Sequence, residues 1–163
     1  MLVVAVTNEQ DQLKIDAARL RGAVEVVLAG EGIGKGEISV AVVDDAAIHE
    51  LNRRWLAHDE PTDVLSFVLE KSEGYREGEI IVGADTALVR AAEFDWSPED
   101  ELLLYVVHGA LHIVGYDDKE PAERERMRER ERFYLERLGV KKGSQDGSGG
   151  RVQGSGDAQA NFA

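Results

Sequence analysis

Apolar residues in this chain follow two spacings, short uninterrupted runs and longer stretches with a helical period. Four runs rich in β-branched residues predict strands at residues 2–6, 37–43, 64–69 and 79–82. Stretches in which apolar residues recur every three or four positions predict helices at about residues 11–29, 45–56, 85–94, 97–114 and 121–138. This order of elements predicts an α+β domain with four strands and four to five helices.

The last two predicted helices differ in character. Ser97 and Pro98 form a strong helix start, and Gly115 a suitable end. Residues 97–114 are apolar on nearly every side, so this helix is expected in the core. Residues 121–138 alternate Glu and Arg with few apolar positions, which is typical of an outer helix that faces solvent.

Composition predicts where the folded domain ends. From residue 143 onward Gly, Ser, Gln, Asn and Ala dominate, which predicts a domain over residues 1–142 and a disordered tail over 143–163.

The apolar run at residues 2–6 is short and follows no positive charges, so it is interpreted as a strand and not a signal peptide. No apolar run approaches the roughly 18 residues of a membrane span. We therefore expect a cytoplasmic protein without a membrane partner.

The acidic net charge argues against non-specific nucleic-acid binding, but one segment of the chain is positively charged. The chain has 32 acidic and 19 basic residues and a net charge of −13. Residues 1–118 carry −15, whereas residues 119–142 carry +3. RNA could be steered along this positive segment; the alternative is a helix whose charges pair with one another. The absence of cysteine excludes disulfides, thiolate metal sites and cysteine nucleophiles.

A polar stripe crosses the apolar helix. It consists of Glu101, Tyr105, His108 and His112, spaced so that they share one face. Histidines four residues apart can both reach one metal ion, and Asp117 or Asp118 can fold back as a third ligand. Two histidines and a carboxylate leave an open coordination position, which is typical of a catalytic zinc site. A metal ion held there lowers the pKa of bound water.

This stripe has two other interpretations. His108 and His112 can be core histidines, although two buried imidazoles would each need polar partners. The spacing also matches the metzincin protease pattern, with Asp118 in the place of the third ligand. A metalloprotease, however, needs glutamate directly after the first histidine, and this chain has Gly109.

Three sequence blocks together resemble the YbeY family of bacterial zinc-dependent rRNA maturation factors. They are Leu51-Asn52 with residues 61–67 (PTDVLSF), residues 78–82 (GEIIV), and residues 108–117 (HGALHIVGYD). The resemblance implies an α+β fold with a small mixed sheet and one zinc ion per chain. It also implies a single-strand-specific endoribonuclease that acts in maturing the 3′ end of small-subunit rRNA and in ribosome quality control. The implied partners are single-stranded rRNA and the small ribosomal subunit with its proteins, but not DNA.

Two positions depart from the family pattern. The third ligand is usually histidine but is Asp118 here, so the ligands expected are His108, His112 and Asp118, with one more negative charge on the site. The family commonly has arginine where this chain has Leu56. The catalytic residue is therefore unknown, and Arg54 and Asp117 are candidates. Alternatively, Arg54 is an ordinary solvated helix residue and Asp117 a partner of the helix end.

Residues of the second block have two interpretations. In the family this segment lies near the metal cleft, so Thr62, Asp63 and Ser66 are expected to shape the substrate groove or to support the ligands. The alternative is ordinary turn and strand chemistry. At the level of function, the competing hypothesis is a non-catalytic, zinc-stabilised ribosome assembly or binding factor, which Leu56 and the acidic surface favour.

Overall fold

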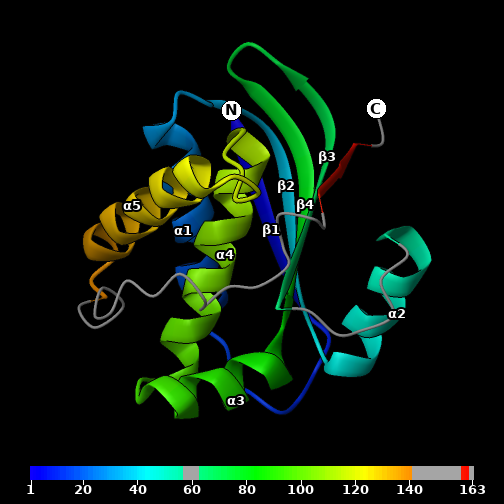
Figure 1. Cartoon of the computed structure of the whole chain (residues 1–163). Helices are drawn as coiled ribbons and strands as arrows, with labels where there is room; N and C mark the ends of the chain where they lie inside the picture. The colour runs from blue at the N-terminus through cyan, green and yellow to red at the C-terminus, as the bar shows by residue number, and fades with distance from the viewer. Residues whose placement is uncertain (57–62, 141–158, 162–163) are drawn as a thin grey trace.

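The computed structural model describes residues 1–56, 63–140 and 159–161. Its elements, in chain order, are β1 (Leu2–Asn8), α1 (Ala17–Gly30), β2 (Lys35–Val43), α2 (Asp45–Leu56), β3 (Val64–Ser72), β4 (Tyr75–Gly83), α3 (Ala84–Phe94), α4 (Pro98–Val114), α5 (Pro121–Arg137) and β5 (Gln159–Asn161). The expected α+β fold is confirmed (Figure 1).

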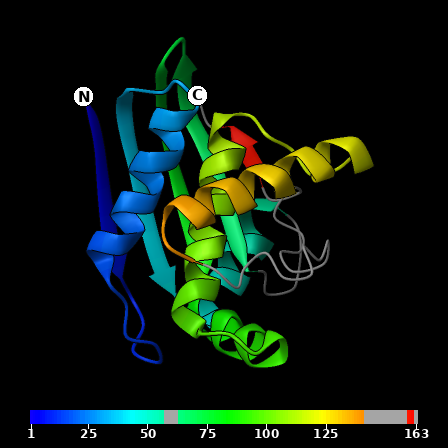
Figure 2. The same ribbon diagram turned by 90° about the vertical axis from the view of Figure 1, so that its left-hand side faces the viewer.

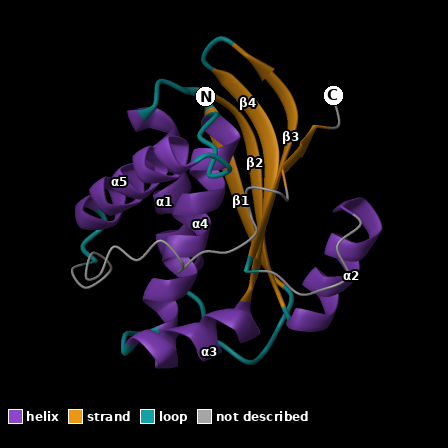
Figure 3. Cartoon of the chain, in the orientation of Figure 1, coloured by secondary structure: helices purple, strands orange, loops and turns teal. Residues whose placement is uncertain are grey.

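The sheet is mixed, with the strand order β1-β2-β4-β3-β5 (Figure 3). β1, β2 and β4 run parallel, and β4 follows β3 through a two-residue turn and pairs with it antiparallel. The four long strands confirm the expected small mixed sheet. β5 adds three residues beside the start of β3 and runs parallel to it.

Helices cover the sheet unequally. α1, α4 and α5 lie over one face, and α2 lies over the other (Figures 1 and 2). The main hydrophobic core fills the space beneath α1, α4 and α5, while a smaller cluster around Ile48, Leu65 and Phe67 lies under α2. α4 is central in the first layer: from Glu101 to Ile113 every side chain is buried. The prediction that this helix belongs to the core is confirmed.

The first helix begins later than its apolar period predicted. α1 starts at Ala17, and the side chain of Asp16 accepts the amide hydrogen of Arg19 as an N-cap. Residues before it form a turn, because the side-chain amide of Gln10 bonds both the amide and the carbonyl of Leu13. Leu13 is nevertheless buried. Its place in the apolar pattern reflects the core and not a helix.

β3 and β4 extend beyond the predicted runs. Their outer halves carry exposed or half-buried charged residues, which an apolar pattern does not detect. Residues 57–62, 141–158 and 162–163 lie outside the described part of the chain, so the domain boundary at 142 and the disordered tail stay predictions. No helix among the described residues is both long and apolar enough to cross a bilayer.

Candidate metal centre

α4 presents both motif histidines to one point. The helix begins where the Ser97 hydroxyl accepts the amide hydrogen of Asp100, with Pro98 in its first turn. His108 and His112 follow one turn apart, with ring centroids 4.7 Å apart and ring planes at 79°. Both are buried, at 1% and 0% exposure. The predicted one-face arrangement is thus present in the structure.

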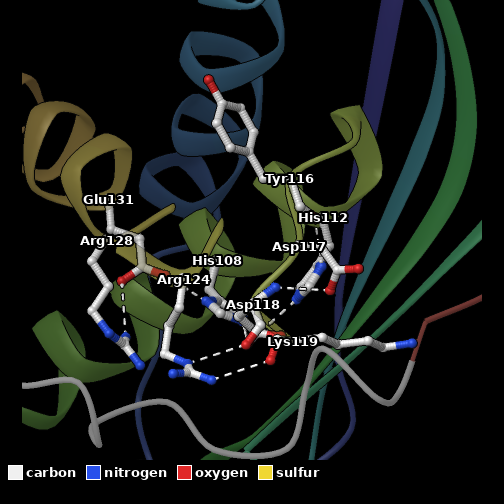
Figure 4. Close-up of polar contacts among 9 residues, drawn as sticks. All are labelled: His108, His112, Tyr116, Asp117, Asp118, Lys119, Arg124, Arg128 and Glu131. Carbon is white, nitrogen blue, oxygen red and sulfur yellow. Dashed lines mark hydrogen bonds and ion pairs between the residues drawn. The ribbon is translucent and has the colours of Figure 1, made fainter. Parts of the chain in front are cut away.

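The turn after α4 brings a carboxylate back to the histidines. Gly115 has a φ of +120°, a conformation that residues with a side chain rarely adopt, and it ends the helix. Three residues later, Oδ2 of Asp118 lies 3.5 Å from Nε2 of His108 and 3.8 Å from Nε2 of His112 (Figure 4). The three ligand atoms all lie within 4.8 Å of one another.

The chemistry of these donors fits a metal ion. The Nδ1 atom of each ring makes a hydrogen bond that points away from Asp118. Nδ1 of His108 donates to Oε2 of Glu131 at 2.5 Å, and Nδ1 of His112 donates to the carbonyl of Tyr116 at 2.9 Å. This leaves both Nε2 atoms facing Asp118. Two imidazole nitrogens and one carboxylate oxygen form a donor set that zinc accepts, and three protein ligands leave a position for water or substrate.

Electrostatics couples the three side chains. Burial alone lowers the pKa of His108, but the carboxylates of Glu131 and Asp118 outweigh burial and raise this pKa to about 9. Burial raises the pKa of Asp118, yet hydrogen bonds and attraction from His108 and His112 hold it well below its usual range. Both shifts favour a proton on His108 beside an ionised Asp118 when no metal is bound, and a divalent ion would compete with that proton.

An arginine from α5 holds the ligand-bearing turn. Nε of Arg124 donates to the carbonyl of Asp118 at 3.1 Å, and its terminal nitrogen donates to the carbonyl of Lys119 at 3.2 Å. These bonds act on the backbone and leave the carboxylate of Asp118 facing the histidines (Figure 4). Arg124 thus restricts where the third ligand can lie.

A second anchor holds the same turn from the side of α1. The hydroxyl of Tyr116 donates to Glu31 at 3.0 Å. Glu31 also accepts from the hydroxyl of Tyr134 at 2.6 Å and from the guanidinium of Arg130 at 2.7 Å. Because the carbonyl of Tyr116 accepts from His112, this cluster supports the orientation of the second histidine.

Gly109, which follows the first histidine, is required by packing. A Cβ atom at this position would lie 2.7 Å from Cγ2 of Ile80 and 3.3 Å from Cγ2 of Val64. α4 therefore lies too close to β3 and β4 for a larger residue to fit without displacing the core. The glutamate of a metalloprotease has no room here, which agrees with the sequence argument against that class.

Other predicted site residues fall into different surroundings. Asp63 and Ser66 are both fully buried, and Ser66 pairs with Ile80 in the sheet. The carbonyl of Asp63 accepts the amide hydrogen of Gly83 at 3.0 Å, so strand structure accounts for part of this block. Thr62 lies outside the described residues. A role for these three residues in the substrate groove stays a prediction.

The two catalytic candidates make local contacts. Arg54 is exposed on α2, and its guanidinium lies 3.7 Å from Glu50. Oδ1 of Asp117 accepts the amide hydrogen of Asp118 at 2.8 Å, which supports the interpretation of Asp117 as a partner of the turn. Leu56, which replaces the family arginine, is the last residue of α2. No catalytic role is established for Arg54 or Asp117, and both stay predictions.

Sequence reasoning missed Glu131, the buried partner of His108. A signal was present, because Glu131 lies four residues after Met127 and four before Leu135, two of the few apolar residues of the same helix. In the sequence, however, Glu131 stands among many charged residues that face solvent, so it looks like one of them. Its contact with Nδ1 of His108 places it beside the centre.

A surface hollow of about 310 Å³ adjoins the ligand turn. Its lining comes from Val114, Gly115, Tyr116, Asp117, Glu123 and Arg126. None of the three candidate ligands is in this lining. The hollow lies beside the centre, and Arg126 brings a positive charge to its edge.

Comparison with known proteins identifies relatives of this chain. The model of the family described as Endoribonuclease YbeY matches residues 5–139. A protein of Rhodopirellula baltica named Endoribonuclease YbeY is 43% identical over 130 residues, which cover 78% of this chain and 67% of that protein. One of Salinibacter ruber with the same name is 40% identical over 141 residues, covering 81% and 89% of the two chains.

A solved structure agrees with the sequence relatives. The solution structure of TM1509 from Thermotoga maritima superposes with a TM-score of 0.63 at 31% identity. The match covers 89% of this chain and 95% of that one. The shared architecture therefore extends over nearly the whole of both chains.

Proposed function

This chain belongs to the Endoribonuclease YbeY family, and from that premise we propose that it is a zinc-dependent endoribonuclease that cleaves single-stranded RNA. One observation carries the metal dependence: Nε2 of His108, Nε2 of His112 and a carboxylate oxygen of Asp118 converge at the end of a buried helix. When bound there, a zinc ion supplies Lewis acidity toward water and phosphodiester oxygens. Maturation of the 3′ end of small-subunit rRNA and ribosome quality control are the proposed settings.

The residues of the chain have distinct parts in this proposal. His108, His112 and Asp118 hold the ion. Glu131 and the carbonyl of Tyr116 keep the imidazoles aimed inward. Cleavage by attack of water and by attack of the ribose 2′-hydroxyl are both compatible with this arrangement.

Charge supports a local contact with RNA at the start of α5. Three of the arginines on this helix have partners within the protein, Arg124 on the ligand turn, Arg128 near Glu131 and Arg130 on Glu31. Arg126 and Lys119, by contrast, are exposed close to the turn that carries Asp118. We infer that these two positive charges contact phosphates that flank the cleaved bond.

The test is cleavage of an end-labelled, unstructured RNA by zinc-loaded and chelated protein. We expect cleavage only by the loaded protein, none of the matching DNA, and little of the same RNA annealed to its complement. His112→Ala should be inactive, whereas Glu129→Gln, an exposed change on α5, should behave as wild type. Equal absence of cleavage by loaded and chelated wild type would refute the enzyme hypothesis.

The second candidate is a non-catalytic, zinc-stabilised ribosome-binding factor. Leu56 in place of the family arginine and the charge of −15 over residues 1–118 favour it. On this hypothesis the wild type and a folded His112→Ala variant would co-sediment with small ribosomal subunits, and neither would cleave RNA. Ribosome association stays a prediction of the resemblance, and a cytoplasmic location stays a prediction of the sequence analysis.

A further inference from the structure

We infer that Glu131 is a positioning residue of the metal centre, which holds His108 with Nε2 directed at the ion and strengthens the imidazole as a ligand. The inference deepens the proposed function and rests on it, because it requires His108, His112 and Asp118 to hold a metal. Carboxylates that accept the outer N–H of a metal-bound histidine orient the ring and raise its basicity. The geometry of Glu131 matches this arrangement (Figure 4).

Burial separates Glu131 from the other charges of α5. It is 5% exposed, and the other buried side chains of this helix are Met127, Tyr134 and Leu135. A leucine or methionine would pack at such a position without the cost of desolvating a carboxylate. That cost must be offset by a specific partner, and the partner in contact is His108.

The two oxygens of Glu131 have different neighbours. Oε2 lies 2.5 Å from Nδ1 of His108, while Oε1 lies 3.9 Å from a terminal nitrogen of Arg128. The Arg128 side chain is itself only 11% exposed. The carboxylate is thus held between a guanidinium and the imidazole, which directs one oxygen at the histidine.

The two histidines are supported in different ways. Nδ1 of His112 bonds to a backbone carbonyl four residues away, a local contact set by the end of α4. Nδ1 of His108 depends instead on a side chain 23 residues away on another helix. Packing of α5 against α4 therefore supplies the hydrogen-bond acceptor of His108. Loss of Glu131 would leave the buried Nδ1–H of His108 without this acceptor.

A purely structural role is the rival explanation, in which Glu131 only fastens α5 to α4. The two roles differ in what they do to the bound metal. A fastening residue changes the stability of the metal-free fold, whereas a positioning residue changes metal affinity and the spectrum of the ion. The experiment therefore measures all three quantities.

The proteins compared are wild type, Glu131→Gln, Glu131→Ala and the control Glu129→Gln, an exposed change on the same helix. Zn²⁺ and Co²⁺ affinities come from competition with a chromophoric chelator, ligand geometry from the Co²⁺ absorption spectrum, and stability from urea unfolding of metal-free protein. We expect Glu131→Ala to bind both ions about 10–100-fold more weakly, with an altered Co²⁺ spectrum. Glu131→Gln should lose less, because its amide oxygen still accepts from His108 but carries no charge. Glu129→Gln should match wild type.

The outcomes separate this inference from the proposed function. Wild-type affinity and an unchanged Co²⁺ spectrum in both Glu131 variants, even with reduced stability, would overturn the positioning role and leave the metal site intact. Wild-type protein that binds neither Zn²⁺ nor Co²⁺ would overturn the proposed function itself. Glu131→Gln nearly preserves shape, so it provides the test even if Glu131→Ala does not fold.

Discussion

Gly109 on α4 faces Ile80 on β4 so closely that a Cβ atom added to Gly109 would lie 2.7 Å from Cγ2 of Ile80. Ile80 is fully buried and cannot move into solvent. The helix that carries the histidines is thus placed against the sheet through a position without a side chain. This contact makes the location of the metal centre depend on core packing.

Gly109→Ala is expected to destabilise the metal-free protein by up to about 2 kcal/mol. Alanine gains about 1 kcal/mol of helix propensity over glycine, but overpacking a tight core costs typically about 1–3 kcal/mol and should exceed this gain. Gly22→Ala on α1 is the matched control, because nothing lies within 4 Å of the added Cβ. It should stabilise the protein by about 0.5–1 kcal/mol. Urea unfolding measures both, and stabilisation by Gly109→Ala would contradict the packing argument.

Asp118 is expected to be required for stoichiometric metal, as is His108. Metal content of purified Asp118→Ala and His108→Ala should therefore fall far below one ion per chain. Asp117→Ala is the control for a charge removed from the same turn, and it should keep its metal. Retention of a full equivalent by Asp118→Ala would remove Asp118 from the ligand set.

Asp118→His should keep the metal and shift the acidic limb of the pH–rate profile to lower pH. An aspartate ligand adds a negative charge that weakens the Lewis acidity of the ion, and a neutral imidazole removes this effect. Close charges shift a pKa by about 1–3 units, so the acidic limb should move by about 1–3 pH units. An unchanged profile, measured with the same RNA over a range of pH, would show that this limb does not report on the centre.

Glu31 is expected to stabilise the fold in a pH-dependent manner. Burial raises the pKa of Glu31, but hydrogen bonds from Tyr134, Arg130 and Tyr116 together lower it below its usual value. Glu31 should thus stabilise the protein fully above about pH 5, and this contribution should disappear as pH falls through the lowered folded pKa.

Glu31→Gln is expected to reduce the free energy of unfolding by about 1–2 kcal/mol at pH 7, because hydrogen bonds to a charged acceptor are lost. The difference from wild type should shrink toward pH 3. Glu25→Gln, an exposed change on the same helix, should have little effect at either pH. A difference for Glu31→Gln that is constant from pH 7 to pH 3 would show that its charge is not the cause.

Arg126 is expected to contribute to RNA affinity through phosphate contact. Arg126→Ala should weaken binding of single-stranded RNA regardless of sequence and reduce the salt dependence of log K by about 0.7, the effect of one phosphate contact on a single strand. Arg137→Ala, an exposed change at the other end of α5, should leave both unchanged. Fluorescence anisotropy between 50 and 200 mM salt makes the comparison. Equal salt slopes for wild type and Arg126→Ala would exclude Arg126 from the RNA contact.

Local features of the fold and the centre could be predicted from the sequence by itself. The one-turn separation of His108 and His112 follows from the 3.6-residue period, and Ser97 and Gly115 set the ends of their helix through short-range hydrogen bonds and backbone freedom. The same local reasoning located the four long strands. It failed at residues 11–16, where the side chain of Gln10 bonds the backbone and an apolar position that looks helical belongs to a turn.

Relationships between distant segments were decided only by the tertiary structure. Glu131 meets His108 across 23 residues, Tyr116 meets Glu31 across 85, and Gly109 is confined by Ile80 on a strand that precedes it. Each depends on how α1, α4, α5 and the sheet dock, which is governed by shape and burial over the whole core and not by residue spacing. The sequence alone therefore determined that two histidines share one face of a helix and predicted that they bind a metal, while packing decided which partners hold them in place.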